Sequence, residues 1–223
     1  MTETASRLQG LARPPAPEQP VEEQEERCDL CGEPVPPAHR HLIDVEDRRL
    51  LCACRACTIL FDHRGAGGGH YRLLPQESWA LEGFDLDDAL WRSLDIPVEL
   101  AFFFHSSPAG KVVAFYPAPA GATESLLQLD SWDELVRRNP VLERMEPDVE
   151  ALLVDRTGGA GGQWLVPVDR CYELVGLIRT HWKGFGGGEE LWERVGEFFD
   201  RLRCEAVPVA SDGKETAWRS RTT

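Results

Sequence analysis

The sequence predicts an α+β protein in which a small zinc-ribbon-like metal module precedes an antiparallel sheet domain with packed helices. Two C-x2-C pairs bracket a hairpin pattern near the N-terminus. The strand patterns that follow are joined by short turns and not by crossover helices, which favours an antiparallel sheet. We divide the chain into a disordered tail (1–27), the metal module (28–61), an α+β domain (62–206) and a flexible tail (207–223).

The first tail is rich in Pro, Glu and Gln and has few apolar residues. Such a composition buries too little apolar surface to offset the entropy lost on ordering the chain, so we expect disorder that limited proteolysis removes. These residues also lack the apolar region of a signal peptide. We therefore expect a cytoplasmic protein with reduced thiols.

The metal module carries the spacing of a four-thiolate metal site. Cys28 and Cys31 form the first pair and Cys54 and Cys57 the second, with 22 residues between the pairs. One tight turn presents both sulfurs of a C-x2-C pair to a single ion. We predict these four cysteines as the metal ligands.

The residues between the pairs predict a β-hairpin. Residues 41–45 and 49–52 have strand patterns on either side of a turn. A hairpin brings its two ends together, and with them the two cysteine pairs. Gly32 directly follows the first pair, where a tight turn often requires a positive φ.

Zn²⁺ is the predicted metal and iron is the alternative. A rubredoxin-like iron site uses the same four thiolates, but the second pair lacks the Pro and Gly found around rubredoxin pairs. Cys52 is either a spare ligand or a buried thiol beside the site, and strand alternation would place it on the face of Cys54. His39 and His41 could replace a sulfur, but with four cysteines present we expect them to be exposed residues at the start of the strand.

The α+β domain alternates between strand and helix patterns. The predicted strands span residues 70–74, 98–104, 111–116, 124–129, 149–155 and 163–167. Helices are predicted over residues 85–94 and 131–138, the second opened by a capping box at Ser131. We expect buried thiols at Cys171 and Cys204.

Two longer helices are predicted at the end of this domain. Asp169 is the predicted N-cap of the first, and Gly184 its C-cap. The second carries an apolar stripe that predicts a face packed against the sheet. The residues of that stripe are Leu191, Trp192, Val195, Phe198, Phe199 and Leu202.

The charge distribution argues against a nucleic-acid partner. The formal net charge is −14, and residues 62–206 contribute −11 of it from 14 basic and 25 acidic residues. A duplex-binding protein needs clustered Lys and Arg against the phosphates. Only a small patch of Arg40, Arg48, Arg49 and Arg55 on the hairpin could serve, and a solvated hairpin face explains it better.

Neither a membrane span nor a catalytic motif is present in the sequence. No apolar run approaches the ~20 residues that a spanning helix needs. The G-x-S-x-G, H-E-x-x-H and Walker A patterns are missing, as is a G-x-G-x-x-G after a strand. We therefore expect a protein that is not an enzyme, although a pocket assembled from distant residues would leave no such motif.

Three stretches together resemble an uncharacterised domain family typical of actinobacteria. They are CDLCGE…HRHLIDVEDRRLLCACRACTILF, VELAFFFHSSPAGKVVAFYP and WLVPVDRCYELVGLIRTHWKGF, and the resemblance covers roughly residues 27–206. The family looks like one met beside nickel–iron uptake-hydrogenase genes. The resemblance implies an accessory role near a hydrogenase, and it carries over only the four module cysteines, as metal ligands.

Three classes of function follow from these observations. A metal-binding accessory protein that binds another protein, such as a hydrogenase subunit or maturation factor, fits the four thiolates and the acidic domain. A rubredoxin-like redox carrier would hold iron at the same thiolates and be red as purified. A zinc-ribbon nucleic-acid binder would use the hairpin arginines and bind with steep salt dependence.

Overall fold

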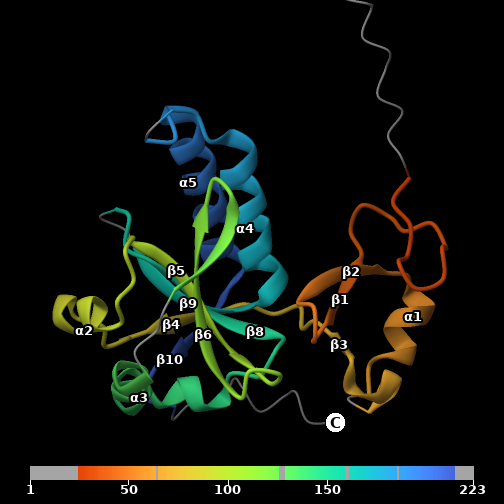
Figure 1. Ribbon diagram of the computed structural model, residues 1–223, viewed down its shortest axis with the longest axis horizontal. Helices are drawn as coiled ribbons and strands as arrows, with labels where there is room; N and C mark the ends of the chain where they lie inside the picture. Colours follow the sequence, from red (N-terminus) through yellow and green to blue (C-terminus); the bar gives the residue numbers. More distant parts are fainter. Residues whose placement is uncertain (1–24, 64, 126–128, 159–160, 185, 214–223) are drawn as a thin grey trace, which may run out of the picture.

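A computed structural model describes residues 25–63, 65–125, 129–158, 161–184 and 186–213. The predicted α+β class is confirmed, with a small three-stranded sheet beside a seven-stranded sheet that is antiparallel except at one edge (Figure 1). The predicted disorder of residues 1–27 falls almost wholly on residues outside the described ranges.

The small sheet has the order β2-β1-β3. Strands β1 (Arg40–Asp44) and β2 (Arg49–Ala53) form the predicted hairpin, and the six-residue helix α1 (Arg55–Leu60) follows at once. Strand β3 (Tyr71–Leu73) pairs with β1. The small sheet therefore takes its third strand from beyond residue 61, where we placed the end of the metal module.

The large sheet has the order β10-β4-β9-β8-β5-β6-β7. Its strands are β4 (Trp79–Glu82), β5 (Leu100–Ser106), β6 (Lys111–Ala118), β7 (Gly121–Ser125), β8 (Glu150–Asp155), β9 (Gly162–Pro167) and β10 (Val207–Ala210). Its helices are α2 (Asp88–Ser93), α3 (Leu129–Arg138), α4 (Val168–His181) and α5 (Glu189–Glu205). Two 3₁₀ segments, Ala66–Gly69 and Pro140–Arg144, complete the described elements.

Helices cover both faces of the large sheet, so it forms the middle of three layers. Phe102 and Phe104 point to the face packed against α4 and α5, whereas Phe103 points to the face packed against α2 and α3. This alternation is the period of two of a β-strand. All three phenylalanines are at most 1% exposed because β5 lies inside the sheet and is covered on both sides.

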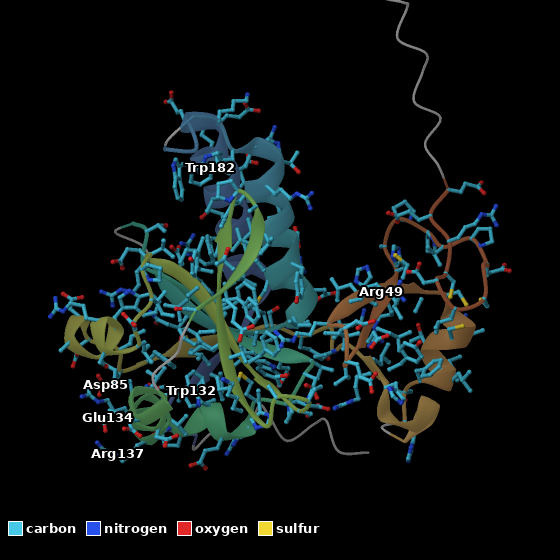
Figure 2. The ribbon with its side chains drawn as sticks, viewed as in Figure 1. Arg49, Asp85, Trp132, Glu134, Arg137 and Trp182 are labelled. Atoms are coloured by element: carbon cyan, nitrogen blue, oxygen red, sulfur yellow. The ribbon has the colours of Figure 1, made fainter. Side chains whose placement is uncertain are left out.

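Helix α3 is amphipathic. Trp132 stacks on Phe103 with ring centroids 5.5 Å apart, while Glu134 and Arg137 lie on the outer side of the helix (Figure 2). The helix begins at Leu129, however, so Ser131 is an internal residue and the predicted capping box is wrong. The hydroxyl of Ser131 instead donates a hydrogen bond to the carbonyl of Ser93 at 2.9 Å, which ties α3 to α2.

Three further expectations about the C-terminal part are corrected. Val207–Ala210, predicted as part of a flexible tail, forms β10, which pairs in parallel with β4 at the edge of the sheet. Trp192 is 44% exposed although it belongs to the predicted apolar stripe, because five other residues of α5 already fill the face toward the sheet. Gly184 has the positive φ of 64° that ends a helix, but the C-cap residue is Trp182.

The small sheet is joined to the large one by apolar and charged contacts. Ile43 is 1% exposed and belongs to the same apolar cluster as Phe102 and the residues of α4 and α5. Arg72 on β3 reaches Glu146 and lies 4.0 Å from Asp148, and both carboxylates belong to the segment before β8. These contacts fix the position of the metal module against the large sheet.

Among the residues that the structure describes, no helix is both long enough and apolar enough to cross a bilayer.

Candidate metal centre

The first cysteine pair lies on a tight turn closed by backbone hydrogen bonds. The amide of Cys28 donates to the carbonyl of Glu33 at 2.8 Å, and the amide of Gly32 donates to the carbonyl of Cys28 at 2.8 Å. Gly32 has a φ of +77°, as predicted, a conformation that a residue with a Cβ rarely adopts. The turn holds the Cys28 and Cys31 sulfurs on the same side of the chain.

The second pair lies at the start of α1, a helix that the sequence pattern did not predict. Cys54 is the N-cap residue with an extended backbone, and its sulfur accepts a hydrogen bond from the amide of Cys57 at 3.5 Å. Thr58 and Ile59 are β-branched and weaken helix propensity, so a six-residue helix is not evident from the pattern. The first turn of α1 thereby presents both sulfurs of the second pair.

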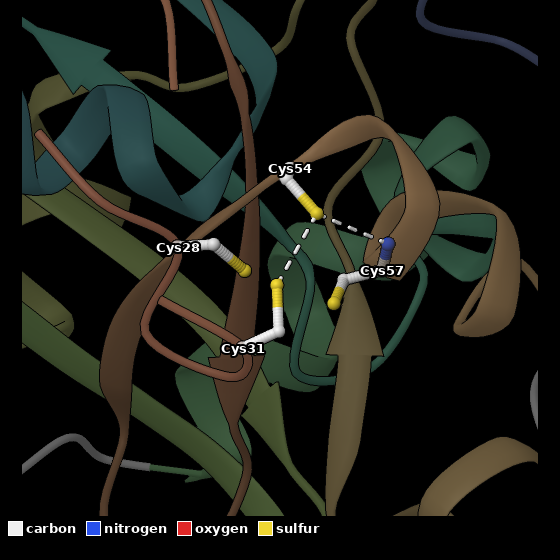
Figure 3. Close-up of side chains that lie close together, drawn as sticks. All are labelled: Cys28, Cys31, Cys54 and Cys57. Carbon is white, nitrogen blue, oxygen red and sulfur yellow. Dashed lines mark hydrogen bonds between the residues drawn. The ribbon is translucent and has the colours of Figure 1, made fainter. Parts of the chain in front are cut away.

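The hairpin brings the two pairs into one cluster. The four cysteine sulfurs lie within 4.8 Å of one another and turn toward a common centre (Figure 3). The Cys31 and Cys54 sulfurs are 3.6 Å apart. Tetrahedral Zn²⁺ with Zn–S bonds of about 2.3 Å separates its sulfurs by about 3.8 Å, whereas a disulfide would require about 2.05 Å. The donor set fits a metal ion and not a disulfide.

A comparison with protein-family models matches residues 27–206 to a family of unknown function (DUF5947). The chain belongs to the DUF5947 family. The matched range contains all four cysteines of the cluster, and it reaches the C-terminal end of α5. No curated protein and no solved structure matches the chain.

The other three cysteines of this DUF5947 chain lie outside the four-sulfur cluster. Cys171 is fully buried in the apolar core, as expected, but Cys204 is exposed and not buried. Cys52 lies in β2, is half-buried and packs against the apolar cluster that contains Cys54. Its sulfur also groups with His39 and His41. These histidines are half-buried, and not the exposed residues we expected.

The cluster combines a buried and an exposed side. Cys28, Cys54 and Cys57 are at most 8% exposed and pack with Leu42 and Leu51 from the hairpin. Cys31 is exposed. A metal at this position would be shielded from solvent on the side of the three buried cysteines and would approach solvent at Cys31.

The metal-free thiols differ in their proton affinity. Burial raises the pKa of Cys28, but backbone hydrogen bonds from Cys54, Leu30 and Cys31 outweigh it and hold the pKa at about 6. Burial raises the pKa of Cys57, and the neighbouring thiols raise it further. One sulfur is therefore ready to bind a cation at neutral pH, and others must lose a proton as the ion enters.

For this reason, the affinity for the metal is expected to decrease as the pH is lowered. In the metal-bound protein the thiol pKa values lie below those of the unfolded chain, so the stabilisation is present above the unfolded values and is lost as the pH falls. Zinc titrations between pH 8 and about pH 5 should show progressively weaker binding. Calorimetry in buffers of different ionisation enthalpy should show proton release on binding, and a pH-independent affinity would contradict the thiolate site.

Proposed function

We propose that this protein is a metal-binding accessory protein whose four-cysteine module is held by structural Zn²⁺ and binds a protein partner, a hydrogenase subunit or maturation factor. The observation that carries this proposal is the closed set of four thiolates. Four protein ligands use every position of a tetrahedral Zn²⁺ and leave none for a substrate. Such an ion stabilises the surface around it.

The choice of zinc rests on the surroundings of the sulfurs. The second pair lies on a short helix and lacks the Pro and Gly of rubredoxin pairs. Elemental analysis and the colour of the purified protein test this choice. Colourless protein containing zinc supports the accessory role, whereas red protein that bleaches on reduction would replace it with the redox carrier.

A groove next to the metal cluster supports the choice of a protein partner. It has a volume of about 620 Å³ and lies between the loop before β1 and helix α1. Pro34, Pro36 and Ala38 line one side, and Ile59 lines the other. Ile59 is 69% exposed and Leu60 is 65% exposed, the two most exposed large apolar side chains among the described residues. Contiguous apolar surface of this kind is typical of protein interfaces.

The acidic domain supports a partner with a basic surface. Residues 62–206 carry a formal charge of −11, which would repel nucleic acid and anionic lipid and favour a cationic protein surface. The hydrogenase context itself comes from the family resemblance and from no feature of the site.

Affinity capture from a native host that expresses hydrogenase, together with a deletion strain, tests the partner. We expect tagged protein to retain a hydrogenase subunit or maturation factor and the deletion to impair hydrogen uptake. Capture of neither, with normal hydrogen uptake in the deletion strain, would remove the hydrogenase role and leave the metal module.

Ile59→Glu is expected to weaken partner binding at least tenfold, because it places a carboxylate in the apolar groove. Val98→Glu is the matched control, since Val98 is also an exposed aliphatic residue (38%) but lies away from the groove. Both variants should keep the wild-type metal content. Equal retention of the captured partner by the two variants would exclude the groove as the binding surface.

A further inference from the structure

A second group of metal-ligating side chains lies on the other face of the hairpin. In the register of β1 and β2, His41 is directly opposite Cys52, and His39 precedes His41 by two positions. Paired residues share one face of a sheet, so His41 and Cys52 lie on the same face, and the ring of His39, just before β1, lies 4.8 Å from that of His41. Their ligand atoms all lie within 4.8 Å of one another. The four-cysteine cluster packs against Leu42 on the opposite face.

The hydrogen bonds of His39 fix which ring nitrogen is free. Nδ1 lies 2.8 Å from the carbonyl oxygen of Pro36, and a carbonyl only accepts, so Nδ1 carries the proton. Nε2 then has a lone pair. This atom is buried, in a side chain only 6% exposed, and has no hydrogen-bond partner within the described part of the chain. A buried polar nitrogen without a partner costs free energy, which a bound ligand would recover.

His41 is oriented in the manner of a metal ligand. Its Nδ1 lies 2.9 Å from Oδ2 of Asp169 in the first turn of α4. A carboxylate that accepts a hydrogen bond from Nδ1–H fixes the orientation of the ring and leaves Nε2 free to bind a metal. This arrangement is found around most ligating histidines. Asp169 thus has a role other than the predicted helix cap, since Pro167 is the N-cap residue.

Further negative charge surrounds the group. Asp29 accepts a hydrogen bond from the amide of Cys52 at 2.6 Å, and a carboxylate oxygen of Glu26 lies 3.6 Å from Nδ1 of His39. Both carboxylates favour a cation here. A purely structural role, in which the histidines only tie the loop and α4 to the hairpin, explains both Nδ1 contacts but leaves the buried Nε2 of His39 unexplained.

We propose that His39, His41 and Cys52 form a second metal site that binds Zn²⁺ or a similar late first-row divalent ion through two imidazoles and one thiolate. A tetrahedral ion separates such donors by about 3.5 Å, so the three side chains would draw together as the ion binds. Three protein ligands leave a fourth position for an exogenous ligand, unlike the closed four-thiolate cluster. His39 and His41 line a groove of about 480 Å³ against α4 through which that ligand would enter.

Equilibrium dialysis of the full chain at a buffered micromolar Zn²⁺ concentration tests this site. Elemental analysis should give about two zinc ions per wild-type chain, as two sites require, and about one for His39→Gln and for Cys52→Ser. Cys204→Ser is the control, because this thiol is exposed and outside both clusters, and it should keep two. One zinc per chain in wild type and in all three variants would overturn the proposal.

A second readout does not depend on total metal content. Zn²⁺ should slow the alkylation of Cys52 in the wild type, and His39→Gln should abolish that protection while Cys28 and Cys57 stay protected. This pattern separates the second site from the four-thiolate site, whose failure would expose Cys28 and Cys57 as well. Alkylation of Cys52 at the same rate with and without Zn²⁺ would overturn the proposal even if the variants fold poorly.

Discussion

Replacing Cys57 by serine is expected to remove one metal ion per chain and to unfold the region around α1. The Cys57 thiol is 8% exposed and shares one small apolar cluster with Cys28, Cys54 and Leu42. Few other contacts hold this region, because α1 has a single buried side chain and that side chain is Cys57. Without the ion, the two pairs lose the interaction that joins them.

The expected size of this effect is large. In small zinc modules the binding free energy is folding free energy, about 10–16 kcal/mol at pH 7. This binding free energy is larger than the stabilisation that the small apolar cluster around the cysteines can provide, so the region should unfold without the ion. The large sheet has two apolar clusters of its own and should stay folded.

Metal analysis and hydrogen exchange measure this outcome together. We expect amide protection to be lost across residues 28–32 and 54–60 and to be retained in β5 and β8. Cys171→Ser is the matched control, because this buried cysteine lies in the core of the large sheet and not in the metal cluster. A Cys57→Ser protein that keeps the wild-type metal content would contradict the four-ligand assignment.

The second large effect is expected at Arg72, which joins the small sheet to the segment before β8. Its side chain is 16% exposed and forms ion pairs with Glu146 and Asp148. Asp148 is 5% exposed and also accepts a hydrogen bond from the amide of Ser107 at 2.8 Å. Removal of the guanidinium takes this counter-ion from the buried Asp148 carboxylate and the partly buried Glu146 carboxylate.

Arg72→Met should therefore destabilise the protein by about 2–3 kcal/mol, somewhat below the value for a fully buried pair because water reaches part of the site. Urea unfolding checks the magnitude. Arg49→Met is the matched control, since Arg49 is on the neighbouring hairpin and exposed. Metal content should not change in either variant. Equal stability of the two variants would show that Arg72 does not hold the two sheets together.

The clustering of the four cysteines is the feature that the sequence predicted most completely. A C-x2-C pair acts through one local turn, and the turn at Gly32 has the positive φ that the sequence indicated. The hairpin between the pairs also follows from local alternation. The main strands of the large sheet were predictable for the same reason, since β5 and β8 carry long apolar runs.

Features that depend on distant partners were not predictable. Val207–Ala210 is a strand only because the edge of β4 accepts it. Trp192 is exposed because the sheet covers only one face of α5, and other apolar side chains occupy that face. Helix α1 is too short to show a periodic pattern, and its start is fixed by Cys54.

The sequence alone thus determined the four-cysteine cluster and the hairpin between its two pairs, because cysteine spacing and strand alternation are properties of neighbouring residues. Only the tertiary structure decided what surrounds them. It placed Cys52 with His39 and His41 on the other face of the hairpin, and it supplied Asp169 from a position 128 residues away. The physical reason is that the orientation of an imidazole depends on the group that accepts a hydrogen bond from its N–H. Only folding brings that group into contact with the ring.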